Sequence, residues 1–320
     1  MNEHPENHCQ CGCVPAAEEE LGHDELLAEL VTVRDWLRYA VTRFNRAHIF
    51  CGHGVDNTFD EATWLIFATL ALPPDRLDTF LDACIPSAER AALFDNIERR
   101  ASKRIPTAYL VNEAWLGAYR FYVDERVIIP RSYFGEQLNN SVLASWIGHP
   151  ETVTSVLDLC TGSGCLAILM AEIFLNADVA AADISKDALD VAVRNIADYG
   201  LEDRIELFQC DLFESLGGRL FDLILCNPPY VTAESMEALP PEYLHEPTLA
   251  LSAGEDGLTI IRRLIAEAAQ YLHPNGILAV EVGHNRHLVE NAFPNLPFTW
   301  LTTYSGVSGI FLLHREDLTG

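Results

Sequence analysis

The spacing of apolar residues changes along this chain, and its first part has the spacing of helices. Apolar residues recur there at three- and four-residue intervals, which is the pattern of an amphipathic helix. The clearest run is Leu26, Leu30, Val33, Leu37 and Val41. Further helices are expected at about 59–71, 75–83 and 87–103. We therefore predict a small helical domain over 24–105.

A second pattern follows over 107–129, where aromatic and β-branched residues are frequent. This composition, with a turn expected near Gly117-Ala118, predicts a β-hairpin. The stretch ends in Pro130-Arg131-Ser132, whose proline stops a strand and whose serine can cap the next helix. We assign 106–131 to a linker, and expect Arg131 either at the mouth of a site or in a salt bridge between domains.

From about 152 onward, apolar strand patterns alternate with helical ones, which predicts a doubly wound α/β domain with a largely parallel seven-stranded sheet. The expected strands are 153–158, 178–183, 204–209, 220–226, 276–282, 298–304 and 308–314. The expected helices are 164–175, 186–199 and 257–272. The last two strands leave no room for a helix between them, so they should form an antiparallel hairpin at the sheet edge. This domain is assigned to 132–320.

The amino-acid composition indicates which class of protein this is. The 320 residues are 49% hydrophobic, enough for two cores. Residues 1–23 are polar and acidic without periodicity, which predicts a disordered tail. Its thiols, Cys9, Cys11 and Cys13, lack the spacing of a paired zinc site, so we expect no metal there. Nine scattered cysteines, no membrane span and no secretory signal indicate a cytoplasmic protein with reduced thiols.

The chain is strongly acidic, with 21 basic against 47 acidic side chains and a formal charge of −26. This charge opposes non-specific binding to a phosphate backbone, so we expect no sequence-specific DNA binding. A basic protein partner suits it better, although a local basic groove stays open as an alternative.

Candidate chemistry lies where the predicted strands end. Asp158 ends the first strand and precedes Thr161, Gly162 and Gly164, whose glycines allow a tight turn and close approach of backbone amides to a ligand. Asp158 can bind an ammonium group or the water beside it. A third glycine and a Lys-Ser or Lys-Thr pair are both absent, so dinucleotide and phosphate-loop sites fit poorly.

Two further carboxylates end the next strands. Asp183 can accept both hydroxyls of a ribose, and Asp211 can accept from an exocyclic amino group. Parallel strands present their carboxyl ends at one edge, where such folds bind ligands. A nucleoside with an attached amino acid fits these carboxylates.

Asn227-Pro228-Pro229-Tyr230 follows the fourth strand. The prolines end the strand, Asn227 offers an acceptor and two donors, Pro228 offers a carbonyl and Tyr230 an aromatic face. This set suits a planar amide or amine. An ordinary Asn-Pro turn is the plain alternative.

With this tetrapeptide, the chain resembles class I S-adenosylmethionine-dependent methyltransferases that act on planar nitrogen. It is similar to the branch that modifies protein glutamines, the relatives of the release-factor glutamine methyltransferase, and more closely to the branch acting on large-subunit ribosomal protein three. The stretches that carry the resemblance are Gly52-His53-Gly54, Asp56-Asn57, Asp60-Glu61-Ala62, Arg104-Ile105-Pro106, 121–126, 158–165 and His245-Glu246-Pro247. Cys160, where many methyltransferases have glycine, and Ser132 match the ribosomal branch.

The resemblance implies an enzyme that methylates the side-chain amide nitrogen of a glutamine, with S-adenosylmethionine as cofactor. The implied cofactor-binding residues are Asp158, Thr161, Gly162, Gly164, Asp183, Asp211 and Asn227, and the implied catalytic residues are Asn227, Pro228, Pro229 and Tyr230. The implied substrate is a basic ribosomal protein or an assembling large ribosomal subunit, recognised by the helical domain. The segment 231–257, called the lid segment below, is expected to contact the substrate.

Two rival interpretations remain. Adenine N6 and cytosine N4 methyltransferases use a similar tetrapeptide, but they usually carry a basic recognition region. Here Arg34, Arg38, Arg43 and Arg46 are offset by many acids. A catalytically silent cofactor-binding scaffold is the other rival, and the intact tetrapeptide argues against it.

Overall fold

The computed structural model describes residues 22–139, 147, 149–304 and 306–319. The predicted tail falls outside these residues except for its last two positions, and so does the expectation about Cys9, Cys11 and Cys13. His23 already begins a helix, α1 (His23–Glu29). The helical region therefore starts one residue before the predicted boundary.

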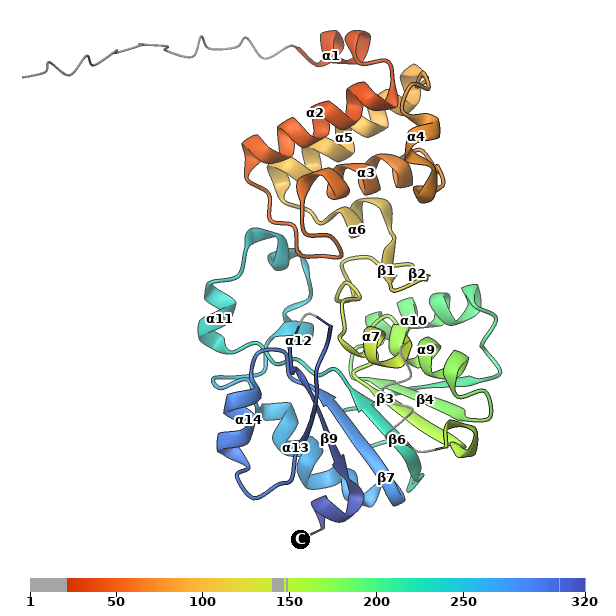
Figure 1. The fold of residues 1–320 in the computed structure, drawn as a ribbon, viewed down its shortest axis with the longest axis vertical. Helices are drawn as coiled ribbons and strands as arrows, with labels where there is room; N and C mark the ends of the chain where they lie inside the picture. Colours follow the sequence, from red (N-terminus) through yellow and green to blue (C-terminus); the bar gives the residue numbers. More distant parts are fainter. Residues whose placement is uncertain (1–21, 140–146, 148, 305, 320) are drawn as a thin grey trace, which may run out of the picture.

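The first domain is a helical bundle, as predicted (Figure 1). Its helices are α1, α2 (Val33–Ala47), α3 (Thr58–Thr69), the short turns η1 (Pro74–Arg76) and α4 (Leu77–Phe80), and α5 (Ser87–Lys103). Thr32 caps α2 and Asn57 caps α3, because each side chain accepts a hydrogen bond from a first-turn amide. Trp36 and Phe44 of α2 are fully buried in its core.

The linker corrects the prediction of a hairpin over 107–129. Its first residues form a helix, α6 (Thr107–Val111), and only β1 (Ala114–Leu116) and β2 (Tyr119–Phe121) pair as antiparallel strands. Pro106 has the fixed φ that starts a helix, and Asn112 ends that helix in the left-handed region. The turn between the strands lies at Gly117 as predicted, with φ +62°.

A seven-stranded sheet forms the second domain, in the order β5-β4-β3-β6-β7-β9-β8. Its strands are β3 (Ser155–Leu159), β4 (Asp178–Asp183), β5 (Ile205–Gln209), β6 (Phe221–Cys226), β7 (Leu272–Glu281), β8 (Thr299–Leu301) and β9 (Ile310–His314). The first five are parallel, and β9 pairs antiparallel with both β7 and β8. The predicted sheet and its antiparallel edge hairpin are confirmed.

Helices cover both faces of this sheet and bury one apolar cluster on each. One face carries α7 (Phe134–Asn139), α9 (Cys165–Ile173) and α10 (Lys186–Asp198), and the other carries α13 (Thr259–Glu267) and α14 (Arg286–Ala292). Short 3-10 turns complete the domain: η2 (Pro150–Thr152), η4 (Ala268–Gln270) and η5 (Arg315–Leu318). As predicted, Ser132 supports the start of the next helix, because its Oγ accepts from the Phe134 amide.

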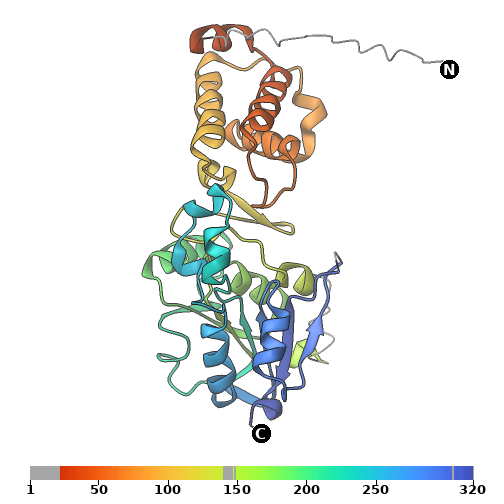
Figure 2. The same cartoon turned by 90° about the vertical axis from the view of Figure 1, so that its left-hand side faces the viewer.

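The lid segment forms compact turns between the two domains (Figure 2). It contains α11 (Ala233–Glu237), η3 (Pro241–His245) and α12 (Thr248–Leu251). Its two ends pair with each other, because the Val231 amide donates to the Leu251 carbonyl and the Val231 carbonyl accepts from the Ala253 amide. The segment is thus a folded bridge over the carboxyl edge of the sheet.

Candidate active site

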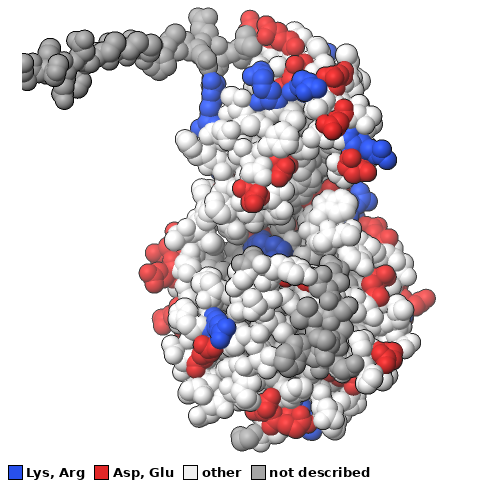
Figure 3. Space-filling view, in the orientation of Figure 1, with Lys and Arg blue, Asp and Glu red and all other residues white. Residues whose placement is uncertain are grey.

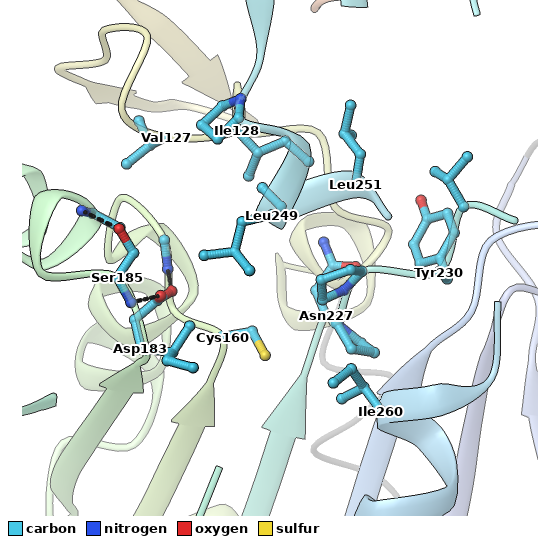
Figure 4. Close-up of a pocket in the computed structure, with 18 of the residues that line it drawn as sticks. Val127, Ile128, Cys160, Asp183, Ser185, Asn227, Tyr230, Leu249, Leu251 and Ile260 are labelled. Atoms are coloured by element: carbon cyan, nitrogen blue, oxygen red, sulfur yellow. Dashed lines mark hydrogen bonds between the residues drawn. The ribbon is translucent and has the colours of Figure 1, made fainter. Parts of the chain in front are cut away.

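A cavity of about 610 Å³ lies at the carboxyl edge of the sheet. Its wall combines the β3–α9 turn, the ends of β4 to β7, the lid segment, the linker and Gly52 of the helical domain (Figure 4). This volume is within the range of small-molecule sites, roughly 300 to 1,000 Å³. The site is therefore assembled from both domains and from the bridge between them.

The turn between β3 and α9 departs sharply from ordinary backbone geometry. Cys160, Gly162 and Gly164 all have positive φ, at 60°, 55° and 79°. Gly162 lines the cavity. A Cβ at Gly164 would lie 3.2 Å from the Ala192 Cβ, so this glycine permits close packing of α10 and does not line the cavity. Cys160 adopts a left-handed backbone conformation that glycine enters more easily than other residues.

Asp158 lies behind this turn. Its carboxylate is fully buried, and its Oδ2 accepts from the Thr161 hydroxyl at 2.5 Å and from the Ala167 amide at 3.1 Å. Within the described residues its Oδ1 has no hydrogen-bond partner. Burial raises the pKa of Asp158 to about 7. Asp158 and Thr161 thus hold the turn from behind, and neither belongs to the cavity wall.

Asp183 is placed directly on the cavity wall at the end of β4. Its Oδ2 accepts from the Gly162 amide and its Oδ1 from the Ser185 amide, both at 2.9 Å (Figure 4). Burial raises the pKa of this carboxyl. Each oxygen keeps a further lone pair, so the carboxylate can still accept two hydroxyl protons from a ligand.

Asp211 lines the same end of the cavity, where it is paired with a residue that sequence reasoning missed. Arg263 of α13 donates to both of its oxygens, at 2.8 and 2.9 Å. The two residues are far apart in the chain, and no local pattern points from one to the other. Arg263 orients the carboxylate and also joins the cavity wall.

The Asn227-Pro228-Pro229-Tyr230 tetrapeptide follows β6 and lines the cavity with all four residues. Within the described residues no hydrogen bond engages the Asn227 side chain, which leaves its amide available to a ligand. The Tyr230 carbonyl accepts from Asn285 Nδ2 at 2.6 Å. A Cβ at Gly283 would lie 2.7 Å from the Tyr230 ring, so glycine at that position makes room for the ring.

Arg131 meets the first of the two expectations held for it, a place at the site, while its ion pair joins the linker to the lid segment and not one domain to the other. It lines the cavity, and its guanidinium pairs with Glu246 of the lid segment, with Nη2 2.7 Å from Oε2. Glu246 Oε1 also accepts from the Ile129 amide. Burial opposes ionisation of Glu246, but His53 and Arg131 outweigh it and lower the pKa to about 2. His53 Nε2 lies 3.7 Å from Glu246 Oε2, which is too long for a hydrogen bond.

A second buried glutamate joins the lid segment to the helical domain. Glu242 is 0% exposed and accepts from the Phe50 amide at 2.9 Å and from Arg100 at 3.2 Å. Arg100 also donates to Glu61 at 2.6 Å. Burial opposes ionisation of Glu242, but the Phe50 amide and Arg100 prevail and lower its pKa. The lid segment is therefore fastened to the helical domain and the linker at once.

Comparisons with known proteins match most of the chain. A family model described as "Methyltransferase small domain" matches residues 140–296. The chain is 56% identical over 292 residues to a protein of Neisseria meningitidis serogroup A named ribosomal protein uL3 glutamine methyltransferase, covering 91% of this chain and 96% of the relative. Proteins with that name from Bordetella pertussis and Bradyrhizobium diazoefficiens are 52% and 48% identical, each over 91% of this chain and 97% and 92% of theirs.

Two further findings concern membrane spans and metal sites. None of the described helices is long and apolar enough to cross a membrane. The part of the chain that the structure describes also contains no cluster of three or more His, Cys, Asp and Glu side chains able to hold a metal ion.

Proposed function

We propose, since this chain belongs to the family of ribosomal protein uL3 glutamine methyltransferases, that it methylates the side-chain amide nitrogen of a glutamine in uL3 with S-adenosylmethionine. The observation that carries this proposal is the placement of Asn227 and Pro228, which line the cavity that Asp183 also lines. An amide-binding corner and a nucleoside-binding carboxylate thus share one enclosed space. We place the reaction in the cytoplasm, where ribosomal proteins are made.

The residues of the cavity fit S-adenosylmethionine. Asp183 is available to the ribose hydroxyls, Asp211 to the exocyclic amino group, and the Gly162 backbone allows close approach. Asp158, Thr161 and Gly164 act on the cofactor indirectly, because they hold the turn that bears Gly162. When bound, the cofactor supplies an electrophilic methyl group on sulfur.

The tetrapeptide orients a nucleophile that is weak by nature, because an amide nitrogen shares its lone pair with the carbonyl. Asn227 Oδ1 and the Pro228 carbonyl each accept one hydrogen of the substrate NH₂ and so fix the nitrogen. Such positioning supplies at best about 7 to 11 kcal/mol of the barrier. As the nitrogen gains positive charge, the same acceptors bind it more strongly, which is the differential stabilisation that catalysis needs. Tyr230 packs against the amide plane.

The surface favours a basic protein substrate over a nucleic acid. Acidic side chains occupy both domains, and the molecule is hollowed at the waist between them (Figure 3). Two of the four arginines that could form a basic patch are paired, Arg34 with Asp82 and Arg43 with Glu98. A nucleic acid with a flipped base would find little unpaired positive charge there to hold its phosphate backbone. We therefore propose that the helical domain and the lid segment receive uL3, free or on an assembling large subunit.

The direct test uses purified protein with S-adenosylmethionine labelled in its methyl group, offered separately to purified uL3 and to ribosomal RNA. We expect label on uL3 alone, and none with Asn227→Ala. Label on the RNA would favour the base-methyltransferase rival. Cofactor binding without label on either substrate would favour the silent scaffold.

A further inference from the structure

Glu281 ends β7 immediately beside the amide-binding corner. Cys226 and Val280 are Cα partners in the parallel pair of β6 and β7. The next residues on these strands are Asn227 and Glu281, so the two leave the sheet as neighbours. Adjacent strands lie only about 4.8 Å apart. Both residues line the cavity.

The Glu281 carboxyl is held firmly but not saturated. It is 1% exposed, and its Oε2 accepts from the Ser132 hydroxyl at 2.6 Å and from the Tyr133 amide at 2.9 Å. A carboxylate has about four acceptor positions, so these bonds leave capacity for another proton. The turn at Ser132 therefore fixes the orientation of a group that still faces the cavity.

The other carboxyls of the cavity wall stand at its cofactor end. Asp183 accepts two backbone amides, and Asp211 is paired with Arg263. Among the described residues, Glu281 is the one carboxyl that lines the cavity next to the tetrapeptide. Methyl transfer places positive charge on the substrate nitrogen, and this charge must be stabilised and then lost as a proton. The Asn227 and Pro228 oxygens are too weakly basic to keep that proton.

We propose that Glu281 is a catalytic residue whose carboxylate stabilises the developing positive charge on the substrate amide nitrogen and then takes up its proton. This proposal rests on the proposed function. The nitrogen forms a bond to the methyl carbon while the carbon–sulfur bond breaks and leaves its electron pair on sulfur. One N–H proton then passes to Glu281, which becomes a carboxylic acid and returns the proton to water.

The surroundings of Glu281 place its ionisation near neutral pH. Burial raises its pKa to about 7, although the bonds from Ser132 and Tyr133 and the charge of Arg131 favour the ionised form. The titratable groups that face it are Arg131 of the linker, Tyr133 just after the linker and Tyr230 of the tetrapeptide. The two tyrosines stay neutral at this pH, since burial raises their pKa. We therefore expect turnover to fall as pH decreases through about 7.

The main test is Glu281→Gln, whose amide oxygen can still accept from Ser132 and Tyr133 but cannot take a proton. We expect kcat on uL3 to fall by a factor on the order of 10². Cofactor affinity should stay within about twofold, and the acid limb of the pH profile should disappear. Full turnover with an unchanged acid limb would overturn the proposal. Wild-type protein that fails to methylate uL3 would instead overturn the proposed function.

A second variant, Ser132→Ala, decides the matter if Glu281→Gln does not fold. It removes a hydrogen bond that favours the ionised carboxylate, so the acid limb should move to higher pH by about one unit. An unmoved limb would contradict the proposal. Thermal stability gives a readout that is independent of turnover. A buried carboxylate with a raised pKa destabilises the fold as it ionises, whereas glutamine does not ionise. The melting temperature of Glu281→Gln relative to that of wild type should therefore increase from pH 5 to pH 8.

Discussion

Asp158, Asp183 and Asp211 end three neighbouring strands, but each carboxylate does something different in the folded chain. Asp158 is enclosed behind the β3–α9 turn, Asp183 faces the cavity, and Asp211 is oriented by Arg263. The three side chains are chemically identical, so the differences between them come from the residues that surround each one. Substitutions at these positions should therefore have distinct effects.

Asn227→Ala and Asp183→Ala should separate turnover from cofactor binding. Asn227→Ala removes the proposed acceptor of the substrate amide, so we expect cofactor affinity to persist while kcat falls by at least about 10²-fold. Asp183→Ala removes the proposed acceptor of the ribose hydroxyls and the acceptor of the Gly162 amide, so cofactor affinity should fall. Calorimetry with S-adenosylmethionine and steady-state kinetics measure the two effects. Unchanged cofactor affinity in Asp183→Ala would refute the ribose assignment.

Asp158→Asn should change how stability depends on pH. The folded-state pKa of Asp158 is raised to about 7 from its ordinary 3.8, so the folded state binds the proton more tightly than the unfolded state. The contribution of Asp158 to stability is therefore greatest below about pH 4 and falls as pH rises through 7, by up to about 4 kcal/mol. Asparagine cannot ionise, so the Asp158→Asn variant should not lose this stability as pH rises. Urea unfolding of both proteins at pH 5 and pH 8 measures this difference. An equal change in the free energy of unfolding between the two pH values for variant and wild type would contradict the prediction.

Helices and strands could be predicted from the sequence where a local residue pattern determines where they begin and end. The strand ends at Asp183 and at Asn227, with the tetrapeptide that follows, could be predicted because apolar runs and prolines mark them. The helix α6 could not, since Pro106 and the left-handed Asn112 override a β-like composition. The anchors of the lid segment were also missed: Glu242 and Glu246 contact residues more than a hundred positions away, and no spacing in the sequence reveals such pairs.

The attachment of the lid segment can be tested with Glu246→Gln. The variant leaves the partly exposed Arg131 without its charged partner. Breaking a fully buried pair costs roughly 3 to 5 kcal/mol of unfolding free energy, so we expect a loss of up to about 3 kcal/mol here. Asp82→Asn is the matched control, because its ion pair with Arg34 is largely exposed and should contribute little to the free energy of unfolding. Equal losses in denaturant unfolding of the two variants would contradict a structural role for Glu246.

The same pair predicts an acid dependence. The pKa of Glu246 is lowered to about 2 from its ordinary 4.5, because interactions with His53 and Arg131 outweigh burial. Its stabilisation is therefore present above about pH 4.5 and is lost as pH falls toward 2. In Glu246→Gln this acid-induced loss should be smaller than in wild type, while the Asp82→Asn control should follow wild type.

At the scale of the whole molecule, the helical domain and the sheet domain enclose one cavity with the lid segment between them. The doubly wound sheet and its antiparallel edge were predictable, since alternation of strand and helix patterns leaves few topologies. The joint between the domains was not, because buried ion pairs such as Glu242 with Arg100 form between distant segments. This joint brings Gly52 of the helical domain onto the wall that also holds Asn227. Residues of both domains and of the lid segment thus line a single cavity.

The most direct measurement is peptide mass spectrometry of a ribosomal extract from cells lacking this enzyme, after incubation with purified protein and S-adenosylmethionine carrying a labelled methyl group. We expect one labelled methyl group on a glutamine side chain of uL3, and none when the Asn227→Ala variant replaces the wild-type protein. Label on another residue type, on another protein or on RNA, with uL3 unlabelled, would contradict it.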